Sequence, residues 1–122
     1  NKTIILVTHD VQEAFDLGHK ICLMDKGKII QTGTPKEMLY QPQNDFVKNF
    51  FAKNRLLLEY KVATLKDMTS LIDGHRFYEE LQFSDNIGLW DALQQLSADT
   101  SLSGDYENLI KAFNEYRKFQ TV

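Results

Sequence analysis

The chain has 122 residues, of which 43% are hydrophobic and 25% are charged, and its formal net charge is −3. This composition is typical of a globular polypeptide with one domain or two small ones, and no apolar run is long enough to cross a bilayer. The charges include no basic block, which argues against a nucleic-acid surface. The single cysteine, Cys22, excludes an internal disulfide, so we expect a reducing compartment and a Cys22 side chain buried in its apolar stretch.

A continuous apolar run over residues 3–8 predicts a β-strand buried on both faces, because its side chains do not alternate with polar ones. The run places His9 at its carboxyl end, where open α/β sheets carry reactive groups. Asp10 is expected to cap the following helix, and Gly18 to end it. Such a strand needs sheet neighbours that this sequence does not supply. We therefore expect the chain to be a fragment that self-associates through its uncovered strand.

The next segments predict an antiparallel hairpin followed by two helices. Strands are expected over residues 20–25 and 28–32, with Lys26-Gly27 as the tight turn. A hydroxyl cap at Thr34, followed by proline and glutamate, predicts a short helix that ends before Pro42. Asn44 is expected to cap another helix, whose apolar face carries Phe46, Val47, Phe50 and Phe51.

The character of the sequence changes near Asn54, where we place a domain boundary, and the tail over residues 55–122 is mostly helical in pattern. A short strand is expected over residues 61–64, a turn at residues 73–76 and a helix capped by Ser84. The large apolar side chains of the tail, Trp90 included, are expected to lie in a core.

The histidines alone do not define a catalytic or metal site. His19 is expected to be exposed at a helix end, and His75 lies in the predicted turn. The spacing of the three histidines matches no zinc-ligand pattern, so no metal site is expected. By the residues alone, His9 is better explained as a histidine that caps or packs at the end of a strand.

A series of short motifs in residues 1–54 nevertheless matches one family in order and spacing. The series is Thr8-His9-Asp10, Glu13-Ala14, Leu17-Gly18, Ile21, Met24, Lys26-Gly27-Lys28-Ile29, Gly33-Thr34-Pro35 and Glu37-Met38-Leu39. This part of the chain resembles the C-terminal end of the ATP-binding subunit of ABC transporters. The continuation to Phe51 is most similar to importers of glycine betaine, proline, choline and related osmoprotectants. The implied fold is α/β: the C-terminal piece of a P-loop ABC ATPase domain, followed by the helical tail.

The resemblance implies that His9 is the switch histidine, which contacts the terminal phosphate of ATP in the complete subunit. A neutral imidazole suits this role because it donates from one nitrogen and accepts at the other. ATP and Mg²⁺ are implied as cofactors of the full-length ATPase. The chain has no Gly-x-x-x-x-Gly-Lys-[Ser/Thr] loop and no apolar strand ending in Asp-Glu, so the fragment alone is expected to be inactive.

The tail leaves two functions open. Residues 62–68 and 83–93 partly resemble a CBS module, and the region 55–122 is too short for two complete copies. A degenerate CBS-like module for regulation or solute sensing, or a helical appendage for subunit dimerisation, is the alternative to a purely catalytic role. The resemblance further implies transmembrane permease subunits and a second ATP-binding subunit as partners, at the cytoplasmic face of the membrane.

Overall fold

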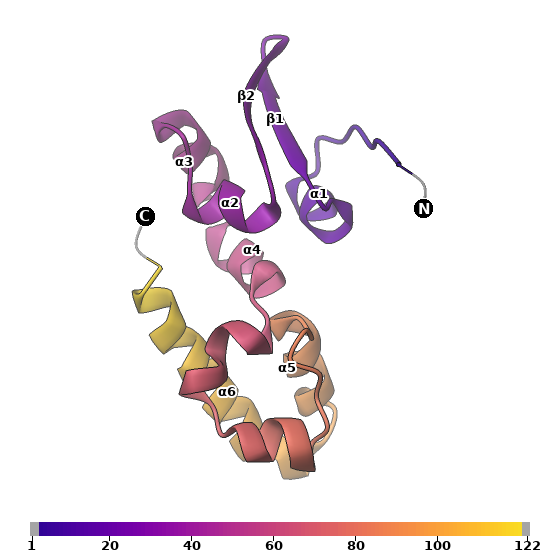
Figure 1. The fold of residues 1–122 in the computed structure, drawn as a ribbon, viewed down its shortest axis with the longest axis vertical. Coiled ribbons are helices and arrows are strands. Elements are labelled where there is room, and N and C mark those ends of the chain that lie inside the picture. Colours follow the sequence, from indigo (N-terminus) through magenta and orange to yellow (C-terminus); the bar gives the residue numbers. More distant parts are fainter. Residues whose placement is uncertain (1–2, 121–122) are drawn as a thin grey trace. The chain divides into compact units, whose positions relative to one another are not determined.

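A computed structural model describes residues 3–120 of the chain, which are helical apart from one two-stranded sheet and its connecting segments (Figure 1). The chain divides into two compact units, Asn1–Leu58 and Glu59–Val122, here called unit 1 and unit 2. Among the described residues, no helix is both long and apolar enough to span a membrane.

Residues 3–9 run extended at the start of unit 1 and pair with no other strand of the described chain (Figure 1). The prediction of a strand buried on both faces is therefore wrong for this structure. Ile4, Ile5 and Val7 are 83%, 87% and 88% exposed. A strand is held by hydrogen bonds to its neighbours, and the residues of this segment have none in the described sheet.

The hairpin of unit 1 consists of β1 (Ile21–Asp25) and β2 (Lys28–Gly33), which pair antiparallel as predicted. Lys26 and Gly27 both have positive φ, 52° and 77°, as a two-residue hairpin turn with right-handed strand twist requires. The prediction of a buried Cys22 is wrong, because side chains alternate along β1. Leu23 points into unit 1 and Cys22 to the exposed face.

Three whole helices of unit 1 accompany this hairpin, α1 (Val11–Leu17), α2 (Pro35–Tyr40) and α3 (Asp45–Ala52), and the first residues of a fourth helix also belong to the unit. The predicted caps are present. Thr34 and Glu37 form a reciprocal capping box that lowers the pKa of the Glu37 carboxyl, and the Asn44 side chain accepts from the Val47 amide at 3.0 Å. The core of the unit consists of Phe15, Leu23, Met38, Leu39, Val47, Phe51 and Leu58.

The division between the units falls inside α4 (Arg55–Val62). The strand expected over residues 61–64 is wrong: Lys61 and Val62 are helical, and Thr64 forms a single isolated bridge to Gly88. The Ala63 amide instead completes a helical bond to the Glu59 carbonyl at 3.1 Å. The helix therefore continues through Lys61 and Val62, whereas Thr64 is extended, with φ of −123° and ψ of 165°.

The described part of unit 2 contains five more helical segments, of which two are α-helices, two are 3₁₀ helices and one is a π-helix. They are η1 (Leu65–Leu71, 3₁₀), η2 (His75–Glu80, π), α5 (Leu89–Ser97), η3 (Thr100–Leu102, 3₁₀) and α6 (Ser103–Lys118). Helix α6 packs against α5 and η1. The resulting core includes Ala63, Leu65, Met68, Phe77, Leu89, Ala92, Leu93, Leu96, Leu109, Ala112, Phe113 and Tyr116.

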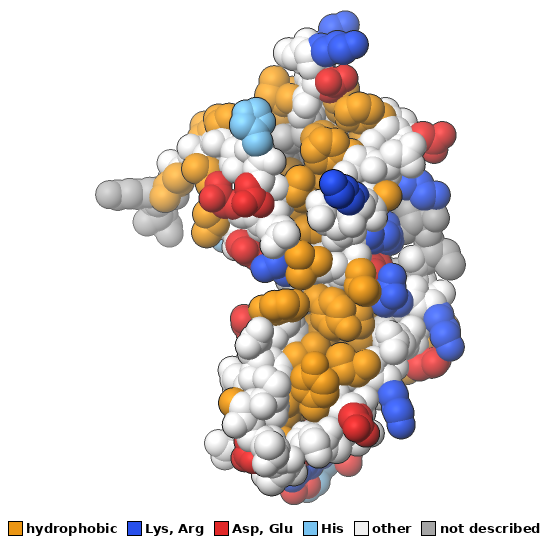
Figure 2. Space-filling model, turned by 180° about the vertical axis from the view of Figure 1, so that it is seen from behind, with side chains coloured by type: hydrophobic (Ala, Val, Ile, Leu, Met, Phe, Trp, Pro, Cys, Tyr) orange, Lys and Arg blue, Asp and Glu red, His pale blue; other side chains and the backbone are white. Residues whose placement is uncertain are grey.

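Two expectations for the tail need correction. Ser84 does not cap α5, because the helix begins five residues later with Gly88 as its N-cap, and the Ser84 hydroxyl accepts from the Asn86 amide instead. Trp90 is 39% exposed and lies at the surface, although its ring contacts that of Tyr60. Hydrophobic side chains reach the surface in both units (Figure 2).

Candidate functional site

His9 lies where the extended segment of unit 1 meets α1. The backbone on its carboxyl side is held by two local bonds: the Asp10 amide donates to the Thr8 hydroxyl at 3.0 Å, and the Asp10 carboxylate accepts from the Glu13 amide at 3.2 Å. The carboxylate of Asp10 is thus engaged in capping α1, as predicted. The imidazole of His9 is exposed to solvent.

Helix α1 fixes the base of this site to the core of unit 1. Phe15 is buried, and its ring meets the ring of Phe51 edge to face, with centroids 5.5 Å apart. The Ala14 amide donates to the Asp10 carbonyl at 3.1 Å, so the first turn of the helix starts directly after His9. The position of the His9 backbone is therefore set by packed structure, and its side chain projects from it.

The aromatic face predicted for α3 is only partly buried. Val47 and Phe51 are in the core, whereas Phe46 and Phe50 are 44% and 43% exposed. The rings of Phe46 and Phe50 stack, with their centroids 6.3 Å apart. Together with residues 4–7, these two rings give unit 1 a large share of uncovered apolar surface.

The other two histidines are not part of the segment around His9. His19 is exposed next to the end of α1, as predicted, and His75 belongs to η2 in unit 2. Within residues 3–120, no three or more His, Cys, Asp or Glu side chains are grouped so that they could hold a metal ion.

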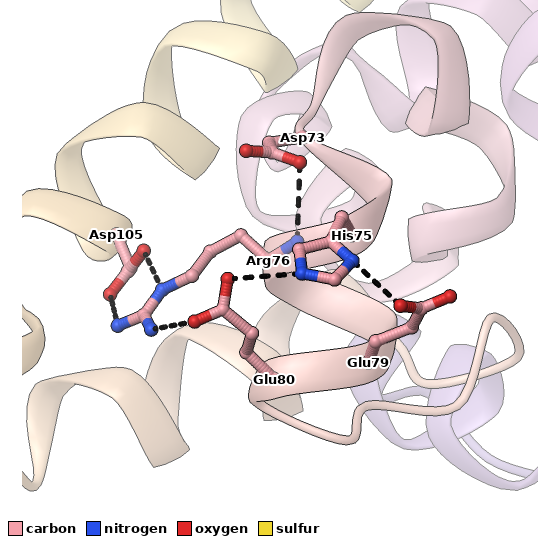
Figure 3. Close-up of polar contacts among 6 residues, drawn as sticks. All are labelled: Asp73, His75, Arg76, Glu79, Glu80 and Asp105. Carbon is pink, nitrogen blue, oxygen red and sulfur yellow. Dashed lines mark hydrogen bonds and ion pairs between the residues drawn. The ribbon is translucent and has the colours of Figure 1, made fainter.

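A cluster of charged side chains around η2 was not predicted (Figure 3). The Arg76 guanidinium donates to both carboxylate oxygens of Asp105 at 3.0 and 2.8 Å, and also pairs with Glu80 at 3.2 Å. His75 Nδ1 lies 2.6 Å from a Glu79 oxygen. The hydrogen bond from Arg76 lowers the pKa of the Asp105 carboxyl, and Asp105 in turn raises the pKa of Arg76.

The sequence indicates only the local contacts of this cluster. The pairs His75–Glu79 and Arg76–Glu80 have the four-residue spacing of helical ion pairs, which could have been recognised. Asp105 lies 29 residues away from Arg76, and no local pattern connects them. The predicted turn at residues 73–76 is instead the start of η2, with the Asp73 carboxylate accepting from the Arg76 amide at 3.2 Å.

A second ion pair in unit 2, which the sequence did not indicate, joins a buried carboxylate to a partly exposed guanidinium. Glu59 is 2% exposed, and its carboxylate accepts from Arg117 Nε at 2.7 Å. Burial also raises the pKa of the nearby Tyr116 hydroxyl to about 12, with smaller contributions from the negative charges of Asp67 and Glu59.

No family model matches the chain, and no solved structure matches it. Several curated proteins do. The chain is 40% identical over 95 residues to the glycine betaine uptake system ATP-binding protein YehX of Escherichia coli (strain K12), a match that covers 75% of this chain and 31% of the relative. It is 49% identical over 57 residues to the glycine betaine/carnitine/choline transport ATP-binding protein OpuCA of Bacillus subtilis (strain 168), covering 47% of this chain and 15% of the relative.

A third relative is the osmoprotectant import ATP-binding protein OsmV of Salmonella typhimurium (strain LT2), 38% identical over 68 residues that cover 56% of this chain and 18% of the relative. The chain thus spans a third or less of the length of these curated relatives.

These similarities confirm that the chain resembles the ATP-binding subunits of ABC transporters. Within that class, the relatives are named for the transport of glycine betaine, choline and carnitine. The predicted resemblance to osmoprotectant importers is confirmed with them.

Proposed function

We propose that this chain is part of the ATP-hydrolysing subunit of an ABC importer for glycine betaine, choline and related solutes, and that His9 is its switch histidine. The similarity to YehX, OpuCA and OsmV carries the proposal for the class of protein. Support for His9 comes from the motif Thr8-His9-Asp10 and from the position of an exposed imidazole directly before α1. In this reading the subunit works with permease subunits and a second ATP-binding subunit at the cytoplasmic face of the membrane.

The role proposed for His9 is electrostatic. In phosphoryl transfer, catalysis depends on positioned donors where charge collects on the phosphate oxygens. His9 would contact the terminal phosphate and help to hold the attacking water, since its two ring nitrogens have opposite hydrogen-bonding roles. Asp10 is assigned no catalytic role, because its carboxylate caps α1.

The residues of this chain do not by themselves fit Mg²⁺-ATP. One imidazole cannot replace the phosphate loop and the metal-binding carboxylate that the sequence lacks. We therefore expect the fragment alone to neither bind ATP tightly nor hydrolyse it. In the full-length protein, the other parts of the site would be supplied by residues outside this chain.

Substitution of His9 in the full-length subunit, assembled with its permease, tests the assignment. We expect His9→Ala to reduce ATP turnover about 100-fold or more, the usual effect of removing a donor that stabilises transition-state charge. His19→Ala is the matched control, because it removes another exposed histidine of unit 1, ten residues away. Unchanged turnover in the His9 variant, with folding verified by circular dichroism, would rule out the catalytic role.

Unit 2 supports a second function, as a regulatory module that senses a solute or mediates dimerisation. It has a core of its own, built from α5, α6 and η1. Comparing the full-length subunit with a version that lacks residues 59–122 tests this. We expect ATP turnover to persist and its dependence on solute concentration to change. Identical dependence in both versions would contradict a regulatory role.

For the isolated chain we also propose self-association between two copies. Ile4, Ile5, Val7, Phe46 and Phe50 of unit 1 are uncovered, and the backbone of residues 4–7 has no partner strand in the described sheet. Sedimentation equilibrium is expected to show a concentration-dependent dimer that Ile5→Lys weakens. A monomer at all concentrations would contradict this proposal.

A further inference from the structure

Residues 75–82 of unit 2 depart from regular α-helical geometry in two ways. Segment η2 is a π-helix, in which the Leu81 amide donates to the Arg76 carbonyl five residues earlier at 2.9 Å. Such helices are rare and occur frequently at functional sites. Gln82, two residues past the end of η2, has φ of 58°, a left-handed conformation that is costly for a residue with a side chain. The π-helix and the left-handed residue that follows it indicate that contacts with the rest of unit 2, and not helix propensity, set the backbone here.

The stretch borders an open depression of about 350 Å³ in unit 2. Its apolar lining includes Ile72, Phe77 and Ala112, and its polar lining includes Asp73, Asn108 and Lys111. The side chains come from the end of η1, from η2 and its N-terminal connection, and from α6. The volume is at the lower end of the range for small-molecule sites, so a ligand with few non-hydrogen atoms would fit.

The walls of the depression are held before any ligand arrives. Arg76 and Asp105, which both line it, form the two-bond ion pair that joins η2 to α6 (Figure 3). The carboxylate of Asp73 accepts from the Arg76 amide at 3.2 Å, which fixes the start of η2. A ligand that enters a site with fixed walls loses less free energy to ordering the protein.

The charges of the lining favour a ligand that carries both signs. Asp73, Asp105 and Glu115 line the depression against Arg76 and Lys111, so a phosphate group would meet a net negative surface. Asp105 is bound to Arg76, and Glu115 pairs with Lys118 at 2.9 Å. Lys111 and Asp73 are then the remaining charged residues of the lining.

We propose that this depression binds a small zwitterionic solute. Its carboxylate would face Lys111 and the Asn108 amide, its cationic end would face Asp73, and its carbon atoms would rest against Ile72 and Ala112. The proposal rests on the second function suggested above, solute sensing by unit 2, and gives that function a location. It is independent of His9, because it concerns binding to this chain and not ATP turnover.

Nuclear magnetic resonance titration of the isotope-labelled chain, with glycine betaine as the probe, tests the proposal. We expect saturable shifts of the amides of residues 72–77 and 105–112 in the millimolar range. Lys111→Gln is expected to weaken binding about tenfold, as the loss of one charge-assisted hydrogen bond would. Asp73→Asn is expected to act in the same direction. Lys66→Gln is the matched control, because it removes an exposed lysine of unit 2 that does not line the depression.

Three results would overturn the proposal. The first is the absence of saturable shifts in a chain whose spectrum shows it to be folded. The second is equal shifts with tetramethylammonium chloride or sodium acetate, which carry one charge each and would indicate a general ionic effect. The third is unchanged affinity in both Lys111→Gln and Asp73→Asn. None of these results would affect the assignment of His9, which is judged by ATP turnover of the full-length subunit.

Discussion

The two units of this chain bury their apolar side chains to different extents. In unit 1, residues 4–7 and the rings of Phe46 and Phe50 remain exposed, and the core is built around a two-stranded hairpin. In unit 2, most large apolar side chains of α5 and α6 are buried in a single cluster, and the larger exposed ones are Leu71, Trp90 and Phe119. A two-stranded hairpin has little stability of its own and depends on what packs against it. We therefore expect unit 1 to depend on further packing against its exposed apolar side chains, and unit 2 to be stable through its own core.

The largest effect expected from a single substitution is in the core of unit 2. Phe113 is fully buried and its ring lies 4.4 Å from that of Tyr60, so Phe113→Ala should leave a cavity and destabilise unit 2 by about 3–5 kcal/mol. Trp90→Ala, which removes a larger but 39% exposed ring, should cost clearly less. Hydrogen exchange of the α5 and α6 amides measures both variants, and equal losses would contradict a core centred on Phe113.

A smaller loss of stability is expected in unit 1, where a buried polar side chain joins two segments of the chain through hydrogen bonds. Gln31 is 5% exposed; its amide group donates to the Gln41 carbonyl at 3.1 Å, and its oxygen accepts from the Gln43 amide at 2.8 Å. Gln31→Ala leaves both backbone groups without this partner and should destabilise unit 1 by about 1–3 kcal/mol.

The neighbouring Thr32 provides the control for Gln31. It lies on the same strand with an exposed side chain, so Thr32→Ala should cost much less, as judged by exchange of the β1 and β2 amides. If the two variants behave alike, the bridge from β2 to residues 41 and 43 does not stabilise the unit.

The elements that the sequence predicted correctly are those with a local chemical signal. Asp10, Thr34 and Asn44 cap their helices through side-chain bonds to amides three residues later, and Lys26-Gly27 turns the hairpin. These signals lie within a few residues of one another, so a single sequence contains them. His9 was selected by resemblance and not by any such pattern, and its role remains a prediction.

The elements that were missed depend on partners distant in the chain. Residues 3–8 have the composition of a buried strand, but strand formation requires neighbours that no local pattern supplies. The pairs Arg76–Asp105 and Glu59–Arg117 join residues 29 and 58 positions apart. The π-helix at η2 likewise has no composition signal, because its geometry is held by tertiary contacts.

The last expected effect occurs only at high pH, where unit 2 should lose stability. Burial raises the pKa of Tyr116 to about 12, above the value of about 10 for an unfolded tyrosine, and burial also raises the pKa of Tyr60. A raised folded-state pKa contributes stability that is complete below about pH 10 and is lost as the pH rises towards 12. The Tyr116→Phe variant has no ionisable group at this position. Its free energy of unfolding should therefore fall less steeply between about pH 10 and pH 12, and Tyr60 should be responsible for part of the fall that remains.

Urea unfolding at a series of pH values, with tyrosinate absorbance recorded in parallel, measures how steeply the free energy of unfolding falls with pH. Equal slopes for the variant and the parent chain would show that Tyr116 ionises as readily in the folded chain as in the unfolded one, and that unit 2 does not exclude water at this ring.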